Sequence, residues 1–93
     1  MSKLRRPRDL GPAGRKLWRE LVHHYAFESG ETASLAELCR IQDRLAQVRE
    51  TLSAEGLVVE KKPHPLATLE VKLSGAFRML WRTLRLDIAE RTK

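Results

Sequence analysis

Apolar residues between positions 35 and 55 recur at alternating intervals of three and four, which is typical of an α-helix with one buried seam. We therefore expect a long helix over residues 33–55. Thr32 suits the N-cap of this helix, and Gly56 suits the left-handed position after its last turn. The seam must be covered by other helices or by a second chain. Its residues are Leu38, Ile41, Leu45, Val48 and Leu52.

Two more amphipathic segments flank this helix. Pro12 suits the first turn of a helix that we expect over residues 12–27, because proline lacks the N–H that this position leaves unpaired. Pro65 begins a third expected helix, over residues 65–86. Gly75 lies inside this third helix. A mid-helix glycine costs about 1 kcal/mol relative to alanine, so we expect Gly75 to permit a close helix crossing.

A short β-prone run, residues 57–60, follows the long helix. Residues 61–65 contain two prolines and should stay extended, since a residue before proline avoids the helical region. After the third helix, Asp87 is expected to cap a last short turn over residues 88–91.

The predicted fold class is all-α, with three helices in one domain. A long antiparallel helical hairpin and a third amphipathic helix are joined by a short extended or β-like link. We assign residues 10–93 to this single helical domain and residues 1–9 to a flexible basic arm. The aromatic residues expected to pack between the helices are Trp18, Phe77 and Trp81.

The short length of the chain, 93 residues, favours self-association. A domain of this size buries only roughly 60–65% of its unfolded surface, so its apolar stripes are generous for a monomer. We therefore expect a homo-oligomer or hetero-oligomer that buries part of the seam between chains. The expected interface residues are Leu38, Ile41, Leu45, Val48, Leu52, Leu73, Phe77 and Leu80.

The net charge of +6 lies entirely in the first fifth of the chain. Residues 1–19 hold seven basic side chains and one acid, whereas residues 20–93 hold eleven of each. Such an arm attracts polyanions, with nucleic acid first and an anionic membrane surface second; a solubilising tail is the alternative. The basic residues continue onto the face of the first helix that also carries His23. The candidate DNA-binding residues are Lys3, Arg5, Arg6, Arg8, Arg15, Lys16 and Arg19.

Other charged residues predict little chemistry. The outer face of the long helix mixes acids and bases and is expected to be solvated; its residues are Glu37, Arg40, Asp43, Arg44 and Glu50. The third helix has a separate face with no acid, formed by Arg78, Arg82 and Arg85. A helix-turn-helix that reads a groove is disfavoured, because the long helix exceeds a usual recognition helix and the basic residues precede it.

Catalytic and metal-binding patterns are missing from the sequence. No glycine-rich loop precedes a helix, and the adjacent His23 and His24 point about 100° apart. Cys39 lies near the seam, where a free cysteine behaves as a small hydrophobe. We expect no enzyme, no metal and no cofactor. A single cysteine and the lack of a long apolar run favour a cytoplasmic protein that does not enter a membrane.

Five short segments resemble the small subunit of the DNA-packaging terminase of tailed phages. They begin at Leu10 (LGP), Leu17 (LWREL), Leu35 (LAELC), Leu52 (LSAEGLVV) and His64 (HPL), and the resemblance covers residues 10–86. It implies a non-catalytic protein that assembles into rings, recognises the packaging site on viral DNA and brings in the terminase large subunit, which carries the ATPase and nuclease. It also implies a bacterial host cell.

The chain departs from this family in two places. The segment between Val59 and Pro65 is short where relatives often carry a longer hairpin, and the sequence stops soon after the third helix. A satellite-encoded redirector that co-assembles with a phage terminase small subunit is therefore an alternative. A small DNA-binding transcriptional regulator is a second alternative.

Overall fold

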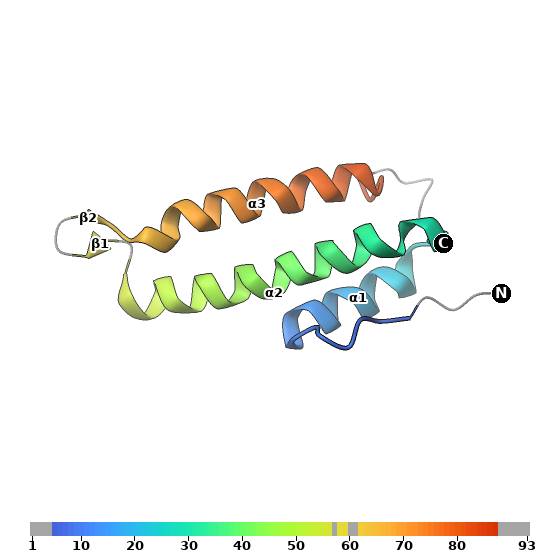
Figure 1. Ribbon diagram of the computed structural model, residues 1–93, viewed down its shortest axis with the longest axis horizontal. Coiled ribbons are helices and arrows are strands. Elements are labelled where there is room, and N and C mark those ends of the chain that lie inside the picture. Colours follow the sequence, from blue (N-terminus) through green and yellow to red (C-terminus); the bar gives the residue numbers. More distant parts are fainter. Residues whose placement is uncertain (1–4, 57, 60–61, 88–93) are drawn as a thin grey trace.

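The computed structural model describes residues 5–56, 58–59 and 62–87, and this part of the chain forms an all-α fold (Figure 1). Its α-helices are α1 (Pro12–His24), α2 (Thr32–Glu55) and α3 (Pro65–Thr83). A 3₁₀ turn, Ser29–Glu31, precedes α2, and two short strands, β1 (Val58–Val59) and β2 (Lys62–Pro63), lie between α2 and α3. The expected fold class of three helices is confirmed.

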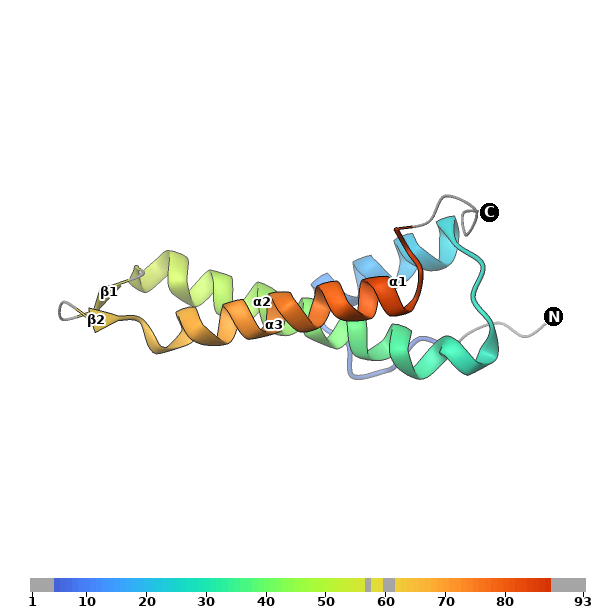
Figure 2. The same cartoon turned by 90° about the horizontal axis from the view of Figure 1, so that it is seen from above.

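Helices α2 and α3 form a long antiparallel hairpin, and they lie side by side in both views (Figures 1 and 2). The strands close the hairpin at its far end, where β1 pairs antiparallel with β2 and Val59 lies opposite Lys62. Helix α1 packs against the N-terminal half of α2, at the end remote from the strands (Figure 1). The molecule is consequently elongated, with extents of 55 × 26 × 18 Å.

The core has two parts that follow this arrangement. Where all three helices meet, Trp18 of α1 packs with Leu35 and Leu38 of α2 and with Leu84, beyond the end of α3. Further along the hairpin, α2 and α3 alone bury a second cluster that includes Leu45 and Leu73. Phe77 and Trp81 are partly buried, and their rings stack with centroids 5.8 Å apart.

The seam of α2 is covered within the single chain. The five seam residues and Leu73 are all buried, with exposed fractions of 8% or less, whereas Phe77 and Leu80 are half-buried. α1 and α3 therefore provide the cover that the seam requires. The seam gives no independent reason for a second chain, and self-association stays a prediction.

The start of α1 is held by a side chain from α2. The backbone N–H groups of Gly11 and Gly14 donate to the two carboxylate oxygens of Asp43, at 2.7 and 2.8 Å. These N–H groups have no partner inside the helix, so Asp43 caps α1 from outside it. The expectation of a solvated Asp43 is therefore wrong; the carboxylate is half-buried.

The close helix crossing lies at Gly14 rather than at Gly75. A Cβ on Gly14 would collide with the Asp43 carboxylate and would lie 2.7 Å from the backbone oxygen of Cys39. A Cβ on Gly75 would meet nothing within 4 Å. The expected role of Gly75 in this chain's own packing is wrong, because its Cα faces away from α1 and α2.

Helix α3 ends three residues earlier than expected. The N–H of Leu86 donates to the oxygen of Trp81, and the N–H of Arg85 donates to the oxygen of Arg82. These two bonds form a Schellman motif, with Arg85 in the left-handed position at φ 59°. The motif turns Leu86 into the core, where it is 4% exposed.

The other helix ends also differ from the expectation. α1 ends at His24 instead of residue 27, because Tyr25 is extended and its hydroxyl donates to the oxygen of Leu86 at 3.2 Å. Thr32 is the first residue of α2 rather than its N-cap, since a 3₁₀ turn leads into the helix. Gly56 has the expected positive φ, 84°, with an extended ψ. The expected turn over residues 88–91 lies outside the described residues.

Candidate nucleic-acid interface

The segment before α1 is attached to the fold at its C-terminal end. Leu10 is buried in the core, and Asp9 accepts two hydrogen bonds from the Arg40 guanidinium, at 2.8 and 3.3 Å. The hydrogen bond from Arg40 lowers the pKa of the Asp9 carboxyl, so it is ionised at neutral pH. Arg15 of α1 also donates to the backbone oxygen of Leu10 at 3.2 Å. These contacts hold the end of the basic arm beside α1.

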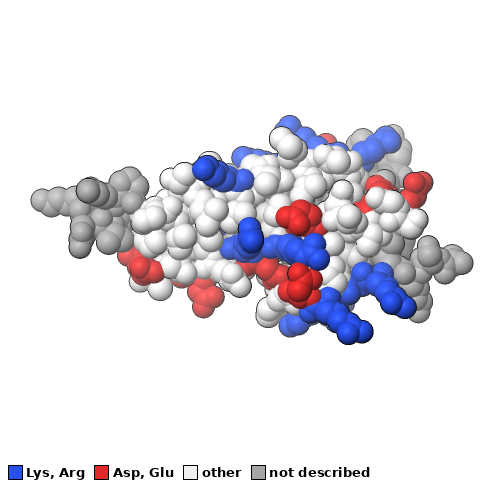
Figure 3. Space-filling view, in the orientation of Figure 1, with Lys and Arg blue, Asp and Glu red and all other residues white. Residues whose placement is uncertain are grey.

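The candidate DNA-binding residues that the structure describes are all exposed. Three precede α1 and three lie on it: Arg5, Arg6, Arg8, Arg15, Lys16 and Arg19. Lys3 lies outside the described residues. Figure 3 shows Lys and Arg side chains over α1 and the segment before it. Asp9, the acid in the segment before α1, is engaged by Arg40, and Glu20 is the exposed acid on α1 itself.

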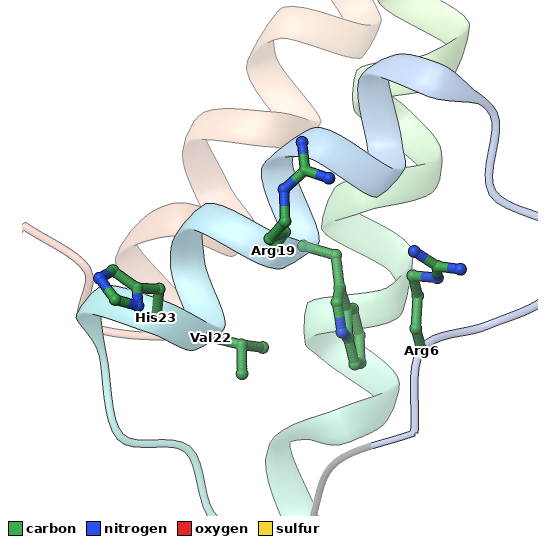
Figure 4. A pocket seen from close by; sticks show the side chains of 5 residues that line it. Arg6, Arg19, Val22 and His23 are labelled. Atoms are coloured by element: carbon green, nitrogen blue, oxygen red, sulfur yellow. The ribbon is translucent and has the colours of Figure 1, made fainter.

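An open groove brings the arm and α1 together. It has a volume of about 650 Å³ and is lined by Arg6, Trp18, Arg19, Val22 and His23. Figure 4 shows Arg6 on the segment before α1 and Arg19, Val22 and His23 on the helix beside it. The sequence could place Arg19 and His23 on one helix face, but the position of Arg6 depends on the docking of Leu10 and Asp9.

The groove suits contacts to phosphate. Guanidinium groups donate in a planar fork that matches phosphate oxygens, and two of them flank this surface. Trp18 lines the groove but is only 5% exposed, so it supports the floor and cannot stack on a base. The surface is therefore suited to the nucleic-acid backbone rather than to reading base edges.

Other chemically interesting groups have structural roles. Burial raises the pKa of the Cys39 thiol from 9.0 to about 12, and the nearby Asp43 charge adds to this effect. His64 is the N-cap of α3: its Nδ1 accepts from the N–H of Leu66 at 3.0 Å, and its Nε2 lies 3.4 Å from Glu55. Within the described residues, no three His, Cys, Asp or Glu side chains are grouped to hold a metal ion.

No helix in the described part of the chain is long and apolar enough to span a membrane. Comparisons with family models, with curated proteins and with solved structures give no match to this chain. The resemblance to the terminase small subunit therefore stays a prediction.

Proposed function

We propose that this protein is a non-catalytic DNA-binding adaptor of a DNA-packaging assembly. The observation that carries the DNA-binding part is the docking of the basic arm beside α1, which combines Arg6 with Arg19 and His23 in one groove. Arg15 and Lys16 lie exposed on the same helix. A row of cations that bridges two segments can follow a phosphate backbone, which supplies most of the affinity of sequence-independent binding.

The packaging role rests on the resemblance to terminase small subunits. The segments that carry it begin just before α1, within α1, within α2 and just before α3. In this role the protein would bind viral DNA and recruit the terminase large subunit. It would contribute no ATPase or nuclease activity of its own.

The DNA-binding part is tested by matched charge reversals. One variant carries Arg6→Glu, Arg15→Glu and Arg19→Glu; its control carries Lys72→Glu, Arg78→Glu and Arg82→Glu on α3. Both change the net charge equally. Fluorescence anisotropy with a labelled DNA duplex should show at least a tenfold loss of affinity for the first variant and a smaller loss for the control. Equal losses would assign binding to net charge and not to this surface.

The packaging role is tested by whether the protein binds a terminase subunit. Native mass spectrometry of the protein mixed with candidate terminase subunits should show a complex with a large subunit. A complex with a phage small subunit alone would replace this proposal with the redirector. Tight binding to a short operator without either subunit would replace it with a transcriptional regulator.

A further inference from the structure

The outward face of α3 has an apolar row that the fold does not use. Val71 and Met79 are 68% and 70% exposed, and Gly75 lies between them at four-residue spacing. Residues four apart lie on one side of a helix, so the three form a continuous row. Val71 and Met79 are also the two most exposed large apolar side chains among the residues that the structure describes.

Gly75 in this row has no role within the chain. Glycine inside a helix costs about 1 kcal/mol relative to alanine, yet a Cβ here would contact nothing within 4 Å. A hollow of about 330 Å³ lies at this position, lined by Gly75, Arg78, Met79, Arg82 and Thr83. A residue without a side chain between two apolar ones allows the backbone of a second helix to approach closely, because interaxial distance depends on side-chain size at the contact.

The surroundings of the apolar row are positively charged. Lys72, Arg78, Arg82 and Arg85 are exposed, and none forms an ion pair with an acid among the residues that the structure describes. Glu70, the only acid in α3, instead pairs with Arg49 of α2 at 3.5 Å. Figure 3 shows Lys and Arg side chains along the edge of the molecule that α3 forms.

We propose that this face of α3 binds an amphipathic helix of another protein, whose apolar stripe is bordered by Asp and Glu. The apolar row and the hollow at Gly75 suit a helix, and the four cations complement its acidic borders. Duplex DNA would match the cations, but it would leave Val71 and Met79 without apolar contacts. This proposal is independent of DNA binding, which uses α1 and the arm.

A second copy of this chain is a poorer match to the face. The outer surface of α2 mixes Glu37 and Glu50 with Arg44, and the outer surface of α1 is itself basic. Neither surface offers an apolar stripe bordered only by acids. Met79 also suits a helical partner, because its flexible thioether adapts to the shape of an apolar stripe.

The probe is a fluorescein-labelled synthetic amphipathic helix with a Leu stripe and Glu borders, and its control peptide has Lys in place of every Glu. Anisotropy should show saturable binding of the Glu peptide and at least tenfold weaker binding of the Lys peptide. In ¹⁵N-labelled protein, the amide shifts induced by the Glu peptide should concentrate on residues 68–83.

The matched variants are Gly75→Gln, which fills the hollow, and Ala46→Gln, which places the same side chain on an exposed position of α2. Gly75→Gln should weaken peptide binding at least tenfold while its DNA affinity stays unchanged and its melting temperature does not fall, because glutamine favours helix over glycine. Ala46→Gln should bind like wild type. Equal binding of both peptides, or an unaffected Gly75→Gln variant, would overturn the proposal.

Two other results would identify a different occupant of this face of α3. Concentration-dependent broadening of the α3 amides without peptide, abolished by Gly75→Gln, would identify a second copy as the occupant. Duplex DNA that shifts the α3 amides and competes with the Glu peptide would identify nucleic acid. Unchanged DNA binding in the α1 variant would overturn only the proposed function, so the two proposals fail separately.

Discussion

At the scale of single residues, Asp43 and Gly14 determine how α1 meets α2. The Asp43 carboxylate lies at the positive end of the α1 dipole and accepts two otherwise unpaired N–H groups. The helical pattern of α2 places Asp43 away from the seam, so the sequence predicts a solvated acid. Its partners lie 32 and 29 residues earlier in the chain. No local pattern could reveal this contact, because it exists only once the helices have packed.

Gly14→Ala should destabilise the protein by about 2 kcal/mol or more, because the new Cβ collides with the Asp43 carboxylate and a backbone oxygen that cannot move aside. Gly75→Ala is the matched control. It should stabilise the protein by up to about 1 kcal/mol, since its site is open and alanine favours helix. Urea unfolding followed by circular dichroism measures both. Equal effects at the two sites would contradict the crossing geometry.

Asp43→Ala should cost about 1–3 kcal/mol, because it leaves two part-buried N–H groups without an acceptor. Glu50→Ala, at an exposed position of the same helix, should change the stability by less than about 0.5 kcal/mol. Urea unfolding compares the two variants. An Asp43→Ala variant as stable as Glu50→Ala would contradict the assignment of Asp43 as the cap of α1.

Cys39 should be inert to thiol reagents in the native state, since it is buried and its pKa is raised to about 12. The sign of the pH effect follows from this shift. The folded state favours the neutral thiol, so its contribution to stability is complete below pH 9 and is lost as the pH rises from 9 toward 12. Native labelling by a disulfide reagent at neutral pH should be slow and limited by unfolding. Rapid labelling without unfolding would contradict the burial of the thiol.

At the scale of elements, periodicity predicts the three helices well, but tertiary contacts decide where they end. α2 differs from its expected range by one residue, because its seam is regular from Leu38 to Leu52. α3 stops early because Arg85 adopts a left-handed conformation that sequence rules assign to glycine. The burial of Leu84 and Leu86 and the hydrogen bond from Tyr25 stabilise this turn. Those contacts were not predictable from local sequence.

Arg85→Gly should stabilise the protein by about 1 kcal/mol, because glycine removes the steric cost of a positive φ at the end of α3. Arg85→Ala removes the same charge but keeps the Cβ, so it should gain less. Thermal unfolding of the two variants separates the backbone effect from the charge effect. A glycine variant no more stable than the alanine variant would contradict the Schellman geometry.

At the scale of the whole molecule, the hairpin and α1 form a single body with two separate basic surfaces. The sequence predicts the basic arm and its continuation onto α1, since both follow from the positions of Arg and Lys along the chain. It does not predict the groove that Arg6 and Arg19 share, because Leu10 and Asp9 must dock first. The sequence likewise suggests that part of the α2 seam is buried between chains, whereas α1 and α3 cover that seam within one chain.

The salt dependence of DNA affinity tests the central claim most directly. Each phosphate contact contributes a slope of about −0.9 to a plot of log affinity against log salt, so about five contacts should give a slope near −4.5 for wild type. Removing Arg6, Arg15 and Arg19 together should make the slope less steep by about 2.7, while the matched α3 variant should keep the wild-type slope. An α1 variant with an unchanged slope would contradict the assignment of DNA binding to the arm and α1.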